Sequence, residues 1–308
     1  NERCKTSTSP KAAPARRCAL ARRLDKDAKQ GLVLISPVLV YALILLAAPL
    51  LLVLTFSFWT QNYLDIDRTL TLANYREALG TPIYQTLMLR SITISLVVTV
   101  VTVVLAFPIA YFLSFHVKKR KALWLFLITV PFWTSYLLRV FLWKVILGYN
   151  GVLNTALMEL GIIDAPLTFI LYNANAVVLT LAHAWAPFAI LPIFVALEKI
   201  DRSLLEAAED LGDGPFRRFW RVTLPLAMPG VVAATLIVLI PTVGDFITPK
   251  LVGGTEGLMI ANMIQVQFGK ANNAPRGAAL AVSSMVIVAT ISVMIYVAGR
   301  YFGGRVKR

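Results

Sequence analysis

Charged residues are scarce in this chain of 308 residues. They make up 15% of the total, whereas about a quarter is usual in soluble globular proteins. Hydrophobic residues make up 58%, and they occur in long blocks rather than in the short stripes of an amphipathic helix. This composition excludes an ordinary soluble domain and indicates a membrane protein.

Cysteine and histidine are also rare, with two residues of each. Cys4 and Cys18 both lie in the polar N-terminal segment with no histidine beside them. Such a pair is typical of neither a disulfide framework nor a zinc site. We therefore expect two reduced thiols and no metal site.

Signatures of catalysis are missing as well. The glycine-rich segment 253–257 contains no lysine, so it is not a phosphate-binding loop of the form G-x-x-x-x-G-K-[ST]. No Ser/His pair at helical spacing indicates an intramembrane hydrolase. We expect the chain not to be an enzyme and to bind no ATP, cofactor or metal ion itself.

The formal net charge of +14 raises the question of nucleic-acid binding. However, the Lys and Arg residues cluster at the ends of the apolar blocks, and no basic stripe interleaved with aromatic residues stands outside those blocks. Basic residues in this position are typical of membrane topology and of contacts with anionic lipid headgroups. No nucleic-acid partner is expected.

Six apolar blocks are each long enough to cross a hydrocarbon core of about 30 Å, which takes roughly 20 helical residues. The sequence therefore predicts an all-α membrane protein with about six transmembrane helices. The predicted spans are residues 31–59, 86–115, 122–147, 173–197, 229–252 and 277–302.

The distribution of basic residues predicts the orientation. Of the 30 Lys and Arg residues, 22 fall on one side of the predicted spans and six on the other. By the positive-inside rule, both termini and the basic loops around 118–121 and 199–221 are cytoplasmic. We expect a multi-pass protein of the bacterial inner membrane.

Two parts of the chain are distinguished by composition. Residues 1–30 are polar and basic and predict a disordered cytoplasmic tail, and residues 31–308 predict the transmembrane domain. The connections at about 60–85, 148–172 and 198–228 are too short to hold a soluble domain. An energy source or an extracellular receptor would have to be another chain.

The cytoplasmic connection 198–228 has the most informative pattern. Ser203 stands three residues before Glu206, a capping-box spacing that predicts a helix from Leu204. Gly212 is placed to end this helix, and Pro215 suits the first turn of a second short helix. The sequence thus predicts two short helices on the cytoplasmic face, a common form for docking to a partner.

The residues of this connection resemble the EAA loop of ABC importer permeases. The matching residues are Glu206, Ala207, Ala208, Gly212, Leu224 and Pro225, with Val222 where the family usually has Ile. The segments 59–75 and 239–254 are similar to spermidine/putrescine-type permeases of that family. The resemblance covers most of the chain from about residue 31, and it implies the type I importer permease fold.

This resemblance implies a machine of several chains. Two copies of a cytoplasmic ATPase would bind ATP–Mg and dock on the coupling helices of the loop. A second permease, expected to be a different chain, would enclose the pathway, and an extracytoplasmic solute-binding protein would deliver the substrate. ATP binding would draw the loops together and turn the cavity outward, and hydrolysis would reset it.

A polyamine is a polycation, so its path should offer carboxylates and aromatic faces. Asp245 lies between Pro241 and Pro249, where the helix is expected to break, and broken helices line substrate cavities in many transporters. We expect Asp245 to attract cations, with Phe246 beside it. The alternative is that Asp245 forms a structural ion pair with Lys250 or another chain.

Aromatic residues of the third and fourth spans are further candidates for the path, through cation–π contacts. They are Trp133, Tyr136 and Trp185. Packing or anchoring at the membrane interface is the alternative role for each. His183 is expected to be a hydrogen-bonded packing residue, and Arg139 and Lys144 are expected to face headgroups or acidic partners, because they would repel a polycation.

Other functions remain open at this point. A permease for another solute, such as iron, sulfate or thiamine, would have the same loop. A stand-alone secondary transporter or channel would leave the loop unexplained, and an intramembrane enzyme would need a catalytic pair.

Overall fold

The computed structural model describes residues 13–63, 65–170 and 172–304. The chain divides into two compact units, residues 1–55 and residues 56–308. Cys4 and the start of the basic N-terminal segment lie outside the described residues.

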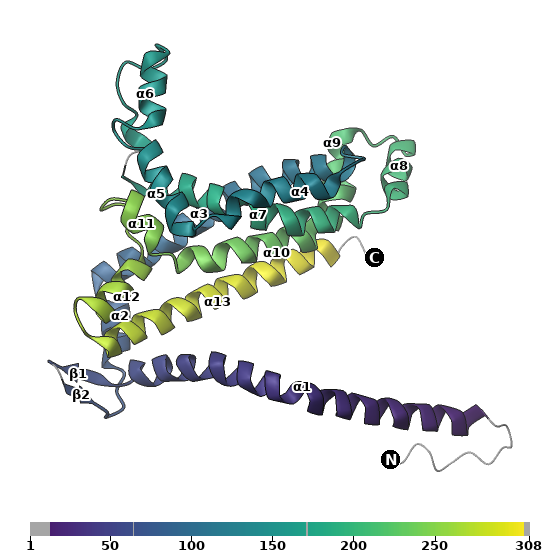
Figure 1. Ribbon diagram of the computed structural model, residues 1–308, viewed down its shortest axis with the longest axis horizontal. Coiled ribbons are helices and arrows are strands. Elements are labelled where there is room, and N and C mark those ends of the chain that lie inside the picture. The colour runs from purple at the N-terminus through teal and green to yellow at the C-terminus, as the bar shows by residue number, and fades with distance from the viewer. Residues whose placement is uncertain (1–12, 64, 171, 305–308) are drawn as a thin grey trace. The chain divides into compact units, whose positions relative to one another are not determined.

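The described part of the first unit belongs to one long helix, α1, which runs from Ala13 to Ser57 (Figure 1). The prediction of disorder up to residue 30 is therefore wrong from Ala13 onward. Residues 15–30 contain neither Pro nor Gly and are rich in Ala, Leu, Arg and Lys, which are strong helix formers. Because these residues extend an existing apolar helix, they avoid the free-energy cost of forming a first helical turn.

The apolar part of α1 is largely exposed. In the candidate span Val33–Ser57, none of the residues in the apolar window is buried. Pro37 and Pro49 lie inside the helix without ending it, as membrane helices tolerate. This stretch suits contact with lipid or with another chain.

The second unit consists of a small antiparallel hairpin and a set of helices. Its elements are β1 (Thr60–Asn62), β2 (Asp65–Asp67), α2 (Ala73–Gly80), α3 (Pro82–Phe115), α4 (Lys121–Thr129), the 3₁₀ turn η1 (Val130–Trp133), α5 (Tyr136–Ile146), α6 (Val152–Glu159), the 3₁₀ turn η2 (Thr168–Ile170), α7 (Ala174–Glu198), α8 (Arg202–Asp210), α9 (Pro215–Arg218), the π-helical turn η3 (Phe219–Thr223), α10 (Leu224–Val243), α11 (Ile247–Val252), α12 (Ile260–Gly269) and α13 (Ala274–Gly304).

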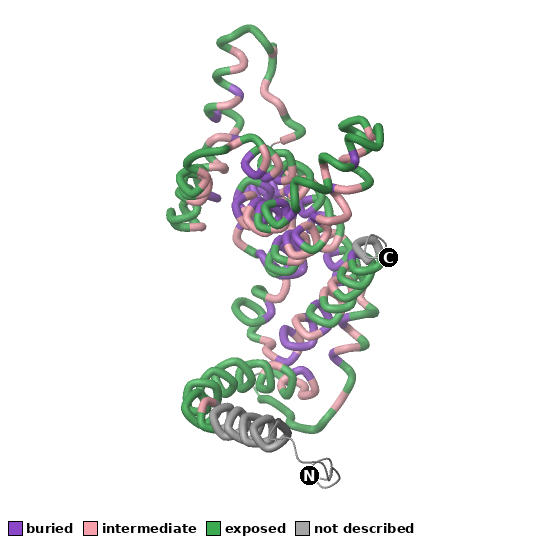
Figure 2. Tube along the Cα trace, turned by 90° about the vertical axis from the view of Figure 1, so that its right-hand side faces the viewer, coloured by how far each residue is buried: buried purple, intermediate pink, exposed green. Residues whose placement is uncertain are grey.

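The core of this unit lies where α3, α7 and α10 pack together, with α13 against α10. Figure 2 shows the buried residues concentrated within this bundle. Leu181, Ile193 and Val238 are fully buried there. Gly230 of α10 faces α7 so closely that a Cβ atom would clash with the carbonyl of Pro192 and the side chain of Ala196.

Five helical segments of the described chain are long and apolar enough to span a membrane, and a bent pair of helices makes a sixth. This agrees with the all-α prediction of about six spans. The five are Val33–Ser57, Pro82–Phe115, Ala174–Glu198, Pro215–Val243 and Ala274–Tyr301.

The third predicted span is not a straight helix. Residues Lys121–Trp133 and Tyr136–Ile146 meet at an angle of 83°. Pro131 lacks a backbone N–H and its ring clashes with the preceding turn. Thr134 then adopts extended backbone angles, and its hydroxyl donates to the carbonyl of Pro131 at 2.7 Å. Pro131 therefore weakens the helix just before the bend.

The fifth predicted span also differs from the prediction. Its helix begins before Pro229 and ends at Val243, so residues 244–252 do not continue it. Gly244 ends α10, and α11 begins at Ile247. The interruption expected around Asp245 is confirmed.

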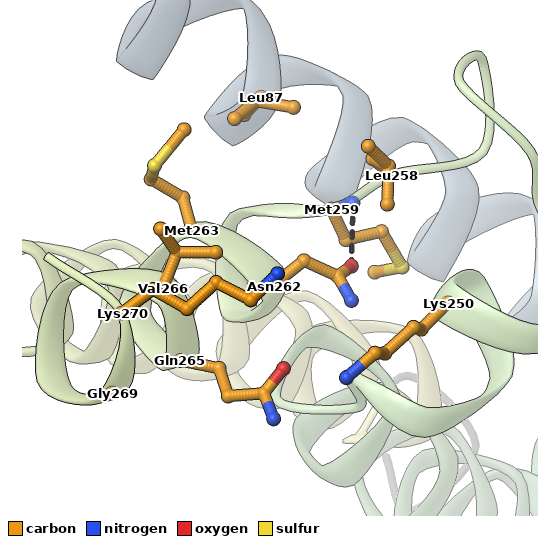
Figure 3. Close-up of a pocket in the computed structure, with 10 residues that line it drawn as sticks. All are labelled: Leu87, Lys250, Leu258, Met259, Asn262, Met263, Gln265, Val266, Gly269 and Lys270. Atoms are coloured by element: carbon orange, nitrogen blue, oxygen red, sulfur yellow. Dashed lines mark hydrogen bonds between the residues drawn. The ribbon is translucent and has the colours of Figure 1, made fainter.

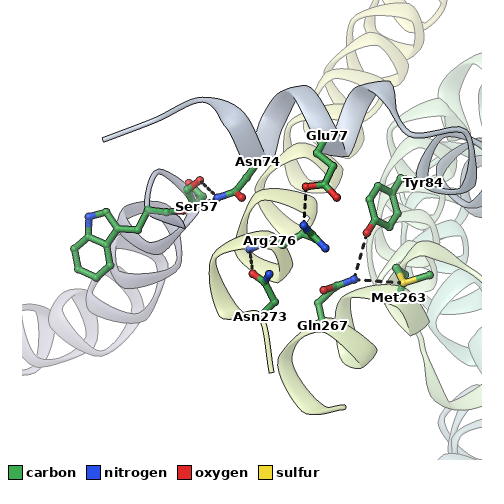
Figure 4. A network of polar contacts seen from close by, with 9 residues as sticks. Ser57, Asn74, Glu77, Tyr84, Met263, Gln267, Asn273 and Arg276 are labelled. Carbon is green, nitrogen blue, oxygen red and sulfur yellow. Dashed lines mark hydrogen bonds and ion pairs between the residues drawn. The ribbon is translucent and has the colours of Figure 1, made fainter. Parts of the chain in front are cut away.

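The two ends of the bundle carry different elements. α8 and α9 lie at one end, and α2, α11 and α12 lie toward the other (Figure 1). At this second end, Arg276 of α13 forms an ion pair of 2.8 Å with Glu77 of α2. Gln267 of α12 donates to the hydroxyl of Tyr84 in α3 at 3.3 Å (Figure 4). These contacts join α13 to α2 and α12 to α3.

Candidate functional site

The predicted coupling loop contains the helix α8, which begins at Arg202, two residues earlier than its sequence pattern predicts. The residue that caps it is Asp201 rather than Ser203, because the Asp201 carboxylate accepts a hydrogen bond from the backbone N–H of Ser203 at 3.0 Å. This backbone hydrogen bond lowers the pKa of the Asp201 carboxyl below its ordinary value. Aspartate is as good a cap as serine, and here it comes first in the chain.

The end of α8 and the start of α9 are as predicted. Gly212 follows the helix with a φ of +83°, a left-handed conformation that glycine adopts without strain. Pro215 occupies the first turn of α9. The chain therefore forms two short helices joined by a tight turn.

Ion pairs hold these two helices together. Arg218 of α9 pairs with Glu209 of α8. Arg217 and Arg221 both lie 3.3 Å from the carboxylate of Asp213, in the turn between the helices. Each exposed pair contributes little alone, but a network of several fixes side-chain geometry.

The EAA-like residues occupy different environments. Glu206, Ala207 and Gly212 are exposed, whereas Ala208 is buried. Leu224 and Pro225 begin α10 and are half-buried. Apolar side chains stand beside the exposed set, with Leu211 at 87% and Phe216 at 77% exposure. An exposed apolar surface of this kind is typical of a protein–protein interface.

A second candidate site is an open cavity of about 490 Å³ at the breaks in the third and fifth predicted spans. Its lining residues come from η1, α5, α7 and the α10–α11 junction. They are Phe132, Thr134, Tyr136, Arg139, Trp185, Phe188, Pro241 and Asp245.

Asp245 is held at the edge of this cavity with 9% of its surface exposed. Its Oδ1 accepts from the backbone N–H groups of Ile247 at 2.9 Å and Thr248 at 3.4 Å, which satisfies the first turn of α11. Its Oδ2 accepts from the hydroxyl of Tyr136 at 2.5 Å. Asp245 thus caps a helix as well as presenting a charge.

Tyr136 connects the two broken spans. Because its hydroxyl donates to Asp245, the second hydrogen bond, 2.7 Å to Thr248, is donated by the threonine hydroxyl. Tyr136 therefore fixes α5 to the start of α11 and orients the carboxylate of Asp245.

Arg139 lies in the cavity lining, which the sequence analysis did not expect. It is buried, at 8% exposure, and its guanidinium lies 5.0 Å from the ring centre of Phe132 and 5.9 Å from that of Tyr136. The prediction that it faces headgroups is wrong, and none of the ion pairs between described residues gives it the acidic partner that was the alternative. One turn of α5 carries Tyr136 and Arg139 on the same side, since residues three apart share a helix face.

The five residues predicted for the path are only partly brought together. Asp245, Tyr136 and Trp185 line the cavity, but Trp133 and Phe246 do not. Trp133 is 74% exposed, and the backbone carbonyl of Phe246 accepts from the side-chain amide of Asn262 at 2.8 Å.

Two lining aromatics were missed by the sequence analysis. Phe132 and Phe188 pack edge to face, with ring centres 4.4 Å apart. Phe188 lies three residues after Trp185 on α7, and the two ring centres are 5.5 Å apart. The three-residue helical spacing from Trp185 could have predicted that Phe188 lines the same cavity.

Lys250 does not pair with Asp245. None of the ion pairs between described residues involves either side chain. Lys250 lines a separate cavity of about 280 Å³ together with Asn262, Gln265 and Lys270 (Figure 3). The intramolecular form of the ion-pair alternative for Asp245 is therefore not realised.

His183 and Lys144 lie outside the lining of the Asp245 cavity. His183 accepts a hydrogen bond at its Nδ1 from the indole N–H of Trp143 at 3.2 Å, which agrees with the predicted packing role. Lys144 lines a narrow pocket beside Tyr172 and Val252.

Residues 100–308 match the family described as binding-protein-dependent transport system inner membrane component. The chain is 38% identical over 260 residues to the spermidine/putrescine transport system permease protein PotB of Haemophilus influenzae, covering 84% of this chain and 90% of that protein. The corresponding protein of Escherichia coli is 36% identical over 260 residues, covering 84% of this chain and 94% of the relative.

A solved structure has a similar fold. It is a bacterial ABC transporter involved in the import of the acidic polysaccharide alginate, with a TM-score of 0.65 over 91% of this chain and 99% of that chain. The sequence identity is 17%, so this likeness concerns the fold alone.

Proposed function

Because the chain belongs to the family of binding-protein-dependent transport system inner membrane components, we propose that it is a pathway-forming subunit of an ATP-driven importer of polyamines. The family and the all-α permease fold agree with the resemblance seen in the sequence. The chain is a transport subunit of the bacterial inner membrane. The polyamine assignment is supported above all by the similarity to two spermidine/putrescine permeases over most of their length.

The proposed assembly has four kinds of component. Two copies of a cytoplasmic ATPase hold ATP–Mg, a second and different permease completes the pathway, and an extracytoplasmic binding protein supplies the substrate. This chain then binds no nucleotide, cofactor or metal itself. Both termini and the α8–α9 loop face the cytoplasm, in keeping with the excess of Lys and Arg on that side.

In this proposal, α8 is the coupling helix. Glu206 and Ala207 face outward from the loop, and the small side chain of Ala207 lets the ATPase surface approach closely. Leu211 and Phe216 add apolar area to the same contact. Since α8 and α9 are tied by the Arg218–Glu209 pair, movement of the ATPases is transmitted to α10 through a stiff loop.

The Asp245 cavity is the proposed place where the chain meets substrate. A carboxylate and four aromatic rings surround it, and both kinds of group attract organic cations. Trp133 and Phe246 lie outside this lining, so their contribution would require a different conformation or the second permease.

An anionic solute is the second candidate, favoured by one observation. Arg139 brings a buried positive charge to the cavity lining, and an anion such as sulfate would be attracted by it. The similarity to spermidine/putrescine permeases favours the polycation, and uptake measurements separate the two.

The test is ATP-dependent uptake of labelled spermidine and putrescine into proteoliposomes that contain this chain with its partner permease and ATPase. The binding protein is supplied outside. Uptake that needs every component is the expected result. The contrary result is uptake of labelled sulfate instead, together with ATPase activity that responds to the binding protein. This result would support the importer assignment and refute the polyamine assignment.

A further inference from the structure

Arg139 is the most unusual charged residue of the transmembrane region. It is more than nine-tenths buried, and its Nε has no hydrogen-bond acceptor among the described residues. No ion pair between described residues includes it. A buried charge without an acidic partner is costly in a membrane protein and therefore indicates a functional role.

The surroundings of the guanidinium are those of a cation site. Two aromatic rings, of Phe132 and Tyr136, lie within the distance at which a ring attracts a cation. The same Tyr136 donates its hydroxyl to Asp245, and all four residues line one cavity. The indole N–H of Trp185, also in the lining, is buried and has no acceptor in the described chain.

From this geometry, and resting on the proposed function, we infer that Arg139 is a resident cation. Its guanidinium lies against the aromatic rings of Phe132 and Tyr136, in the same cavity lining as Asp245, and an ammonium group of the substrate enters these surroundings during transport. The substrate and Arg139 therefore compete for the rings of Phe132 and Tyr136, beside the carboxylate of Asp245 that receives the substrate.

Competition of this kind serves transport. A pathway must bind its solute well enough to admit it and weakly enough to release it. A free cation site with a carboxylate and aromatic rings would hold a polycation tightly and slow its release. A tethered guanidinium returns to the site as the substrate leaves, and it also keeps small inorganic cations out of the cavity between cycles.

The inference makes Arg139 a residue that sets affinity and specificity. Removal of its charge should strengthen cation binding, which is the opposite of the effect expected for a residue that supports the site structurally. Substitution by lysine retains the charge and should retain weak binding, although the ammonium lacks the flat face that stacks on aromatic rings.

The experiment measures equilibrium binding of labelled spermidine to the complete complex in nanodiscs, without the binding protein. Arg139→Gln is compared with the wild type, with Arg139→Lys and with Lys144→Gln, a control on the same helix outside the cavity lining. Arg139→Gln is expected to bind spermidine at least tenfold more tightly, and the two other variants are expected to bind like the wild type.

A double variant assigns the gain to the proposed site. Arg139→Gln combined with Asp245→Asn should lose the tenfold gain, because the carboxylate that receives the cation is gone. Unchanged or weaker binding by Arg139→Gln would overturn the inference, and so would a gain that persists in the double variant.

The failure of the proposed function has a different signature. If the wild-type complex takes up no polyamine, binding of labelled methylguanidinium is measured for the same variants. This cation reproduces the end of the arginine side chain. Tighter binding of this probe by Arg139→Gln, lost in the double variant, would uphold the resident cation without the polyamine assignment. Equal binding of methylguanidinium by all variants would refute the inference that Arg139 is a resident cation.

Discussion

The hydroxyl of Tyr136 lies 2.5 Å from the carboxylate of Asp245, although the two residues are 109 positions apart in the chain. Each residue lies at an interruption, since Tyr136 begins α5 after the bend and Asp245 lies between α10 and α11. One hydrogen bond thus joins the bend of the third predicted span to the break of the fifth. The cavity proposed for the substrate is organised around this bond.

Tyr136→Phe tests the importance of that bond. The substitution retains the ring but removes the donor to Asp245 and the acceptor for Thr248. A hydrogen bond to a charged group contributes about 1.5–3 kcal/mol, so the thermal stability of the purified complex should fall measurably and uptake should decrease. Tyr149→Phe, at an exposed tyrosine, is the control. Equal melting temperatures for the two variants would contradict the role of Tyr136.

Asp245→Asn separates the charge of Asp245 from its capping role. The amide oxygen can still accept from the backbone N–H of Ile247, so α11 should remain folded. The negative charge is lost, and uptake of spermidine at limiting substrate should fall roughly tenfold, equivalent to about 1.4 kcal/mol. Asp245→Ala loses both functions and should in addition destabilise the protein by about 1 kcal/mol. Unchanged uptake by Asp245→Asn would leave only the capping role.

Glu206→Lys tests the coupling helix. Glu206 is exposed and takes part in none of the ion pairs of the described loop, so its replacement should leave insertion and stability unchanged. We expect ATP-dependent uptake to be abolished and the ATPase subunit to be lost on purification. Lys119→Glu, an exposed charge reversal in another basic loop, should retain both. Normal uptake by Glu206→Lys would remove the coupling assignment.

Features of this structure that depend on local sequence could be predicted, whereas features that depend on packing between distant residues could not. The spans and the two short helices of the loop follow from local hydropathy and from residues such as Gly212 and Pro215, whose backbone preferences act at their own positions. The 83° bend after η1 was missed because a proline in an apolar block is compatible with a straight membrane helix, and only tertiary packing decides.

The composition of the cavity shows the same limit. Asp245 was found because a charge in an apolar segment is conspicuous. Arg139 was also noticed but placed wrongly, since its charge alone indicates repulsion of a polycation, and the stacking on Phe132 depends on the bend. The three-residue spacing between Trp185 and Phe188 contained the information that both rings face one side.

Gly230→Val tests the packing of α10 on α7. A Cβ at Gly230 would clash with the backbone of Pro192, which cannot move as a flexible side chain does. Overpacking of this kind typically costs about 1–3 kcal/mol, so the variant should unfold at a lower temperature and accumulate less in the membrane. Gly269→Val, at a position with open space around it, is the matched control. Similar melting temperatures would show that the helices can separate without loss.

Asp201 makes the start of α8 sensitive to acid. Its folded pKa lies below its ordinary value because of the hydrogen bond from Ser203. The carboxylate therefore contributes its full stabilisation at pH values above the unfolded pKa, about 3.9, and loses it as the pH falls through the lower folded pKa. At neutral pH the cap should be insensitive to pH.

Hydrogen exchange at the first amides of α8, corrected for intrinsic rates, measures this contribution. In the wild type, protection should be constant from about pH 7 to pH 5 and decrease below about pH 4. Asp201→Asn retains an acceptor for Ser203 without a titrating group, so its protection should not change with pH. Asp201→Ala should be less protected throughout. The same acid-induced loss in Asp201→Asn as in the wild type would show that another group is responsible.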